Sequence, residues 1–170
     1  MDLVYTPAQQ AFRAEVREWL AANIPDRPLR TLEGEAGFHE HVAWERRLAE
    51  GNWGMVTWPE EYGGRGLDLI EWLIFEEEYW GAGAPLRVNQ NGIFLLGPTV
   101  IEYGTDEQKA RFLTPMAAGE VMWAQAWSEP GAGSDMAAIK TTARRDGDHY
   151  VINGQKTWSS RASFADWGFG

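Results

Sequence analysis

The sequence predicts an α+β protein in which an N-terminal helical domain is followed by an incomplete small antiparallel β-domain. Apolar residues recur at helical spacing through the first 119 residues. After Glu120 the pattern changes to short apolar segments separated by Asp146-Gly147 and Asn153-Gly154, dipeptides that favour tight hairpins. The chain is 44% hydrophobic and 13% aromatic, enough to fill a core. We therefore expect a helical domain over residues 1–119 and the first part of a β-domain over 120–170.

The first helix is predicted from its N-terminal cap. Thr6 and Gln9 form a capping-box pattern, and Pro7 stands at the first helical position. Apolar residues then follow at helical spacing, namely Phe12, Val16, Trp19 and Leu20. The helix should end near Asn23, before a loop over residues 26–37.

Two further helices are predicted over residues 38–50 and 68–80, separated by a turn-rich segment at 52–66. Glu76, Glu77 and Glu78 stand together on the second of these helices. Three adjacent carboxylates could hold a cation, but a solvated helix face is the favoured interpretation.

The last part of the helical domain is predicted to hold a helix over 89–102 that kinks or restarts at Pro98. A second capping box at Thr105 and Gln108 predicts a short helix that reaches about Ala118. From there to residue 165 we expect only strands and turns.

Strands are expected over residues 121–127, 139–145, 149–152 and 155–160. Apolar residues still arrive at 167–170. A sheet that stopped there would leave an unpaired edge. We therefore expect a missing C-terminal part or a partner chain to complete the sheet.

Composition excludes several classes of protein. The net charge is −10 with no basic run, which disfavours nucleic-acid binding, and the absence of cysteine excludes disulfides and thiolate chemistry. The N-terminus, Met1 to Tyr5, lacks the pattern of a secretory signal, and no stretch approaches the roughly 20 apolar residues of a membrane span. We expect a cytoplasmic protein with no membrane segment and no metal. Most of the ten tryptophans are expected in the core or at an interface.

A glycine-rich segment, Trp127 to Asp135, is the first candidate site. Gly131 and Gly133 lack Cβ, so backbone N–H groups can approach an anion such as a pyrophosphate, and Ser134 adds a hydroxyl. A plain strand connection that is rich in glycine explains the segment equally well.

A second candidate is Lys156 to Ser160, after the Asn-Gly dipeptide. A flavin ring needs an apolar wall, which Trp158 can supply, and a few donors at its polar edge, which Ser128 and Ser160 can supply. Taken alone, Trp158 is better explained by core packing in a small sheet.

Four ordered motifs resemble the acyl-CoA dehydrogenase family over nearly the whole chain. They are Pro59 to Leu67, Gly97 to Lys109, Ser128 to Asp135 and Asn153 to Ser160. The resemblance implies FAD as the cofactor and α,β-dehydrogenation of an acyl-CoA as the reaction. A carboxylate base removes the α-proton while the β-hydride passes to flavin N5.

The resemblance also implies roles for individual residues. The segment from Gln125 through Trp127 to Ser134 would hold FAD, with Ser128 at the pyrimidine edge of the isoalloxazine. Gly133 and Ser134 would meet the central region of the cofactor, and Ser134 would also lie near the acyl-CoA. Trp158 would pack against the flavin, and Ser160 would donate toward N5.

This chain departs from the family pattern in three ways. Ser128 and Ser160 replace a frequent Thr and keep its hydroxyl, and Arg161-Ala162 stands where the family often has Asn-Gly. Family members are more than twice as long, and their catalytic glutamate comes from the region that we expect to be absent here. No catalytic residue is therefore assigned, and Glu129 is interpreted as a support for its loop.

The resemblance implies partners as well. We expect an acyl-CoA substrate, an electron-transfer flavoprotein as acceptor, and a homo- or hetero-oligomer, a dimer or a tetramer, acting in fatty acid or lipid β-oxidation. Three alternatives stay open: an acyl-CoA oxidase, a subunit of a heteromeric dehydrogenase, and a non-catalytic remnant or assembly module that binds no flavin.

Overall fold

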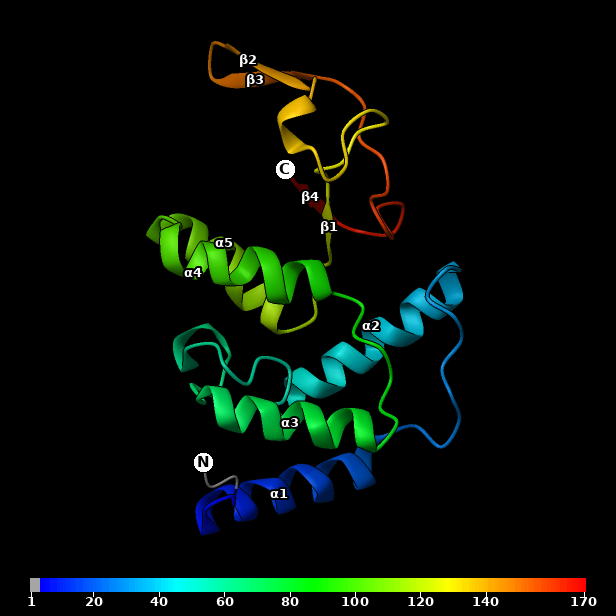
Figure 1. Cartoon of the computed structure of the whole chain (residues 1–170), viewed down its shortest axis with the longest axis vertical. Helices are drawn as coiled ribbons and strands as arrows, with labels where there is room; N and C mark the ends of the chain where they lie inside the picture. Colours follow the sequence, from blue (N-terminus) through cyan, green and yellow to red (C-terminus); the bar gives the residue numbers. More distant parts are fainter. Residues whose placement is uncertain (1–3) are drawn as a thin grey trace. The chain divides into compact units, whose positions relative to one another are not determined.

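The computed structural model describes residues 4–170 (Figure 1). The secretory-signal prediction concerned Met1 to Tyr5, and the first three of these residues lie outside the described part of the chain. The chain forms two compact units, one ending at Glu120 and the other covering Val121–Gly170. The first is helical and the second contains short strands, which confirms the predicted α+β class. Within residues 4–170 no helix is long and apolar enough to cross a membrane.

The main helices of the first unit lie close to their predicted positions. They are α1 (Pro7–Asn23), α2 (Glu35–Glu50), α3 (Leu69–Gly81) and α5 (Asp106–Ala117). Both predicted capping boxes are formed, since Thr6 accepts from the backbone of Gln9 and Thr105 from that of Gln108, each at 3.2 Å. Asp68 and Glu71 form a third capping box, at the start of α3.

The segment predicted as one helix over 89–102 has two parts. Asn91–Leu96 is a π-helix, η2, and Gly97–Tyr103 is the α-helix α4. The helical backbone continues from one part to the other, and the change occurs at Gly97, next to Pro98, which has no N–H to donate to the helical ladder. The turn-rich segment before α3 also contains a short 3-10 helix, η1 (Glu60–Tyr62).

The core of this unit is rich in aromatic residues. Helices α1 and α3 lie side by side (Figure 1) and both contribute residues to it. The Trp53 ring stacks on Phe75 with centroids 5.7 Å apart. The Arg65 guanidinium lies 3.9 Å above the Trp53 ring and donates to Glu15 of α1 at 2.8 Å. The buried cluster consists of Phe12, Val16, Leu20, Trp44, Leu48, Trp53, Val56, Ile74, Phe75, Tyr79 and Ala84.

Two of the three carboxylates in the acidic row on α3 pair with α1, which the interpretation of the row as a solvated face did not include. Glu77 accepts from Arg13, and Glu78 accepts from Arg17 at 2.6 and 3.0 Å. Glu76 accepts from the indole N–H of Trp80. The arginines are paired because α1 packs alongside α3, a proximity that spacing within one helix cannot reveal.

A buried ion pair joins α2 to the segment before η2. Glu45 and Arg87 have side chains that are 2% and 4% exposed, and Arg87 Nε donates to Glu45 Oε2 at 2.9 Å. Arg87 also donates to the Gly54 carbonyl at 2.8 Å, and the Val88 amide donates to Glu45 Oε1 at 2.8 Å. Burial alone would lower the pKa of Arg87, but the Glu45 carboxylate raises it above its usual value, so the guanidinium stays charged.

Two helical glycines should respond in opposite directions to substitution by alanine. A Cβ at Gly97 would lie 2.0 Å from Cζ2 of the buried Trp58, whereas a Cβ at Gly81 would meet nothing within 4 Å. We expect Gly97→Ala to lower the free energy of unfolding by about 1–3 kcal/mol through overpacking. Gly81→Ala should raise it by up to about 1 kcal/mol through helix propensity. Urea denaturation of both variants measures this, and equal effects of one sign would contradict it.

The second unit contains two short two-stranded pairings. Strands β2 (Thr142–Asp146) and β3 (His149–Asn153) form an antiparallel hairpin, and Asp146 faces His149 across the Gly147-Asp148 turn, as the Asp-Gly signal predicts. Strand β1 (Trp123–Gln125) pairs with β4 (Trp167–Phe169) in parallel, which the prediction of an antiparallel sheet missed. Parallel pairing needs a long connection and therefore has no local turn signal.

The predicted strand over 155–160 is not formed, and the Asn153-Gly154 dipeptide does not close a hairpin. Gly154 serves a close approach instead, since a Cβ there would lie 2.1 Å from Thr141 Oγ1. A one-turn 3-10 helix, η3 (Met136–Ala138), precedes β2, which begins at Thr142 and not at the predicted residue 139. No long helix occurs in 121–165, as expected.

Candidate functional site

The two candidate segments lie next to each other in the second unit. The glycine-rich segment leaves β1, and the segment after β3 returns to it, where the Thr157 amide donates to the Ser128 carbonyl at 2.9 Å. The structure thus brings Ser128 beside the turn that contains Trp158, although 30 residues separate them in the sequence.

Glu129 lies at the centre of this junction and is 7% exposed. Its carboxylate accepts from the Lys140 amide at 2.7 Å, from the Thr141 amide at 2.9 Å and from Lys156 Nζ at 3.0 Å. Lys156 Nζ also donates to the Trp127 carbonyl at 2.9 Å.

These neighbours keep Glu129 ionised. The adjacent Thr141 side chain, the Lys140 and Thr141 amides and the Lys156 ammonium together lower the pKa of Glu129 to about 2, against the opposing effect of burial. The Thr141 hydroxyl lies beside the carboxylate but forms no hydrogen bond of standard geometry. A general base works best with a pKa near the operating pH, so Glu129 is poorly suited to abstract a proton.

Trp158 is presented to its surroundings and is not packed in a core. Its side chain is 87% exposed, and its backbone has a φ of 56°, the left-handed region that a bulky residue rarely adopts. Arg161 has a similar φ of 61°, and the Ser160 amide donates to the Trp158 carbonyl at 3.0 Å. Such strain persists where surrounding contacts impose it, and it is concentrated at ligand sites.

The glycine-rich segment leaves room for a ligand against its backbone. A Cβ at Gly131 or at Gly133 would meet nothing within 4 Å, and Gly133 and Ser134 are exposed. The turn is closed by a pair of backbone hydrogen bonds between Glu129 and Ala132, at 2.8 and 3.0 Å. Exposed amides, a hydroxyl and an exposed indole are groups that fit a flavin nucleotide.

The remaining predicted residues lie on β1 and just beyond it. Gln125 is half-buried and opposite Phe169 in the register, and the Trp127 ring meets the Phe169 ring edge-on at 6.0 Å. Among the described residues, Gly133 and Ser134 make no hydrogen bond or ring contact with Trp158 or Ser160. The structure therefore joins Ser128 to the Trp158 turn, and leaves Gly133 and Ser134 at a separate part of the segment.

Sequence reasoning missed one contact between the two candidate segments, the Glu129–Lys156 ion pair. Glu129 was interpreted only as a loop support, and Lys156 was given no role. Both residues stand within quoted motifs, but nothing in their spacing shows that Lys156 reaches back across 27 residues.

Family models match both units. Residues 6–120 match the acyl-CoA dehydrogenase N-terminal domain, and residues 124–169 match the middle domain of the same family.

Relatives and solved structures agree with these matches. Acyl-CoA dehydrogenase IpdE1 of Mycobacterium tuberculosis is 47% identical over 94% of this chain and 43% of its own length. The ChsE4-ChsE5 complex of the same organism superposes with a TM-score of 0.84 at 40% identity, over 99% of this chain and 42% of that one. The Tcur3481-Tcur3483 steroid ACAD superposes with a TM-score of 0.83 at 34% identity, over 99% of this chain and 44% of that one.

The chain thus spans less than half the length of these relatives. Its helical unit and its strand unit each match the corresponding family domain in the family's order. On these matches, the chain belongs to the acyl-CoA dehydrogenase family.

Proposed function

We propose that this chain supplies one wall of the flavin site and part of the acyl-CoA site of an FAD-dependent acyl-CoA dehydrogenase. The observation that carries the proposal is the junction of two segments, in which the Thr157–Ser128 hydrogen bond sets an exposed indole beside a glycine-rich turn. The cofactor-contacting residues we propose are Gln125, Trp127, Ser128, Gly133, Ser134, Trp158 and Ser160, with Ser134 also touching the substrate.

Bound FAD supplies the hydride acceptor for the β-hydrogen of the acyl chain. The residues of this chain bind and orient. Trp158 offers the apolar surface, and Ser128 and Ser160 offer donors to the polar edge of the ring. Glu129 is the carboxylate that lies at the junction of the two segments, and its hydrogen bonds lower its pKa to about 2, so it is poorly suited to remove the α-proton. We therefore propose that the base comes from a part of the complete enzyme other than this junction.

The relatives suggest a finer function. One of the solved structures is the ChsE4-ChsE5 complex, and another, Tcur3481-Tcur3483, is described as a steroid ACAD. We therefore favour a heteromeric enzyme that acts on an acyl-CoA with a bulky, steroid-like acyl group. Such an enzyme would work in the cytoplasm in a β-oxidation sequence and pass its electrons to an electron-transfer flavoprotein.

The isolated 170-residue chain is expected to bind FAD weakly, if at all, and to show no turnover. A site that lacks many of its contacts loses binding energy and preorganisation together. Titration of the purified chain with FAD, followed by flavin fluorescence, measures the first part, and acyl-CoA-dependent dye reduction measures the second. Turnover by the chain alone would contradict the proposal that the base lies elsewhere.

The complete enzyme with its partner chains provides the positive test. Acyl-CoA-dependent reduction of a dye or of electron-transfer flavoprotein should require added or co-purified FAD. Oxygen consumption without any acceptor would favour an oxidase. A colourless complete protein that takes up no flavin would instead identify a non-catalytic member of the family.

A further inference from the structure

We propose that Glu129 and Lys156 form a clamp that fixes the two flavin-facing segments in one geometry, which makes Glu129 a positioning residue for Ser128 and Trp158. This inference rests on the proposed function, because the geometry it protects is that of a flavin site. We use the name clamp for Glu129, Lys156 and their hydrogen bonds.

The clamp gathers several separate segments at one carboxylate. Glu129 Oε2 accepts from the Lys140 amide, and Oε1 accepts from the Thr141 amide, which anchors the glycine-rich segment to the chain just before β2. Lys156 Nζ reaches Glu129 Oε1 at 3.0 Å from the segment that follows β3. Both carboxylate oxygens are thus used, and the Glu129 side chain is 6% exposed.

The chain around Ser128 is restrained by this arrangement. The carbonyl of Trp127, the residue before it, accepts from Lys156 Nζ, and the residue after it is Glu129 itself. Its own carbonyl accepts from the Thr157 amide. Because contacts hold the chain at three successive residues, the direction of the Ser128 Cα–Cβ bond is set, and its hydroxyl is limited to the staggered rotamers about that bond.

The same contacts restrain Trp158 from the other side. Lys156 and Thr157 stand directly before it, and each bonds to the glycine-rich segment. They hold the chain where Trp158 enters its left-handed conformation, at a φ of 56°. Among the described residues, the contacts of Lys156 and Thr157 are the ones at these two positions that link the strained turn to the segment around Ser128.

Charge explains why an ion pair suits this position. The ammonium of Lys156 and the carboxylate of Glu129 neutralise each other, so the clamp brings no net charge to the polar edge of a flavin. Removal of one partner leaves the other charge partly buried and unpaired, since the Lys156 side chain is 25% exposed. A neutral pair of similar shape would lose the charge-assisted bonds but leave no stranded charge.

The test uses the complete flavoprotein with Glu129→Gln, Lys156→Met and the double variant. Glu129→Gln should change the visible absorption and circular dichroism of the bound flavin, and should lower kcat about 10- to 100-fold, the range expected when reacting groups shift by about 1 Å. KM for acyl-CoA should change much less, and the double variant should be no worse than the poorer single variant. Lys156→Arg keeps the positive charge, so its kcat should lie between that of Lys156→Met and that of the wild type.

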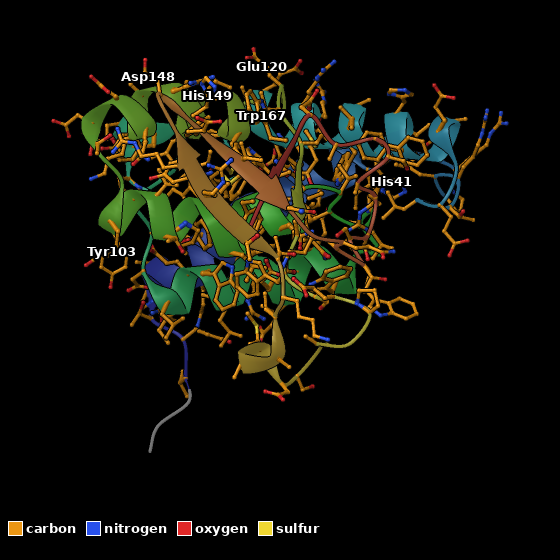
Figure 2. All side chains as sticks on the ribbon, turned by 90° about the horizontal axis from the view of Figure 1, so that it is seen from above. His41, Tyr103, Glu120, Asp148, His149 and Trp167 are labelled. Carbon is orange, nitrogen blue, oxygen red and sulfur yellow. The ribbon has the colours of Figure 1, made fainter. Side chains whose placement is uncertain are left out.

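Asp148→Asn is the matched control. Asp148 lies at the tip of the β2–β3 hairpin (Figure 2), and it is an exposed carboxylate in the same unit. Its variant should keep the wild-type flavin spectrum and kcat. A Glu129→Gln enzyme with lower thermal stability but an unchanged flavin spectrum and kcat would overturn the proposal and leave the clamp a purely structural feature.

A separate measurement distinguishes failure of the clamp from failure of the proposed function. Hydrogen exchange at the Thr157 amide, measured without flavin, should be faster in Glu129→Gln than in Asp148→Asn. Equal exchange rates would show that Glu129 does not hold the two segments together. Faster exchange in a protein that takes up no FAD would confirm the clamp and refute the flavin site.

Discussion

Trp158→Ala in the complete flavoprotein should lose most of its FAD and yet leave the fold of this chain intact. The indole is 87% exposed here, so its removal takes little from the stability of the chain itself. Once a flavin covers it, the loss should resemble that of a buried tryptophan, about 3–5 kcal/mol. That corresponds to a decrease in FAD affinity of at least about 100-fold.

Ser134→Ala provides the contrast. Ser134 offers one hydroxyl near the cofactor phosphates and the substrate, and one hydrogen bond to a charged group is worth about 1.5–3 kcal/mol. This variant should keep most of its flavin colour and show its defect in KM for acyl-CoA or in rate.

The two variants are compared by their FAD content and acyl-CoA kinetics in the complete enzyme. The unfolding midpoint of each 170-residue chain is measured as well. A colourless Ser134→Ala enzyme beside a fully loaded Trp158→Ala enzyme would show that the two roles are reversed. Unfolding of the 170-residue chain by Trp158→Ala would show instead that the indole is a core residue.

Local signals predicted most of the helical unit. The capping boxes at Thr6 and Thr105 and the restart near Pro98 depend on residues three or four positions apart, and the structure contains each of them. What spacing could not give were the contacts between helices. The pairing of Arg13 and Arg17 with the α3 carboxylates depends on how helices pack, and that of Glu45 with Arg87 depends on how α2 packs against the segment before η2.

The strand unit was predicted less well for the same physical reason. The β2–β3 hairpin is local, and its Asp-Gly turn signals it. The parallel pairing of β1 with β4 joins residues 44 positions apart, and no short motif marks it. Asn153-Gly154 has the composition of a hairpin turn, but Gly154 there allows a close approach to Thr141.

The candidate site was identified by motif resemblance more than by pattern. From the residue alone, core packing was the favoured role of Trp158, whereas the structure shows its indole 87% exposed and its backbone in the left-handed region. The Glu129–Lys156 pair needed the structure, because a salt bridge between two loops follows from how the loops fold back.

Glu45→Gln and Arg87→Met should each destabilise the helical unit by about 3–5 kcal/mol, because each leaves the opposite charge buried and unpaired. Domains of this size are stable by only about 5–15 kcal/mol, so either change would remove much of the total.

The double variant Glu45→Met/Arg87→Met removes the stranded charge, but it should not restore full stability. The Gly54 carbonyl and the Val88 amide both depend on this pair for hydrogen bonds, and buried groups without partners cost about 1–3 kcal/mol each. The double variant should therefore be no less stable than the single variants but clearly less stable than the wild type.

Arg47→Met on the same helix is the matched control for this series. Arg47 lies 3.5 Å from Glu50, and their side chains are 55% and 68% exposed, so that variant should change stability by less than about 1 kcal/mol. Urea denaturation followed by tryptophan fluorescence reports on all four variants, since Trp44 and Trp53 are buried in this unit. If Arg87→Met cost no more than Arg47→Met, the buried pair would contribute nothing beyond a surface ion pair. Other contacts, such as the 2.7 Å hydrogen bond between His41 Nδ1 and the Leu86 carbonyl, would then hold α2 to the segment before η2.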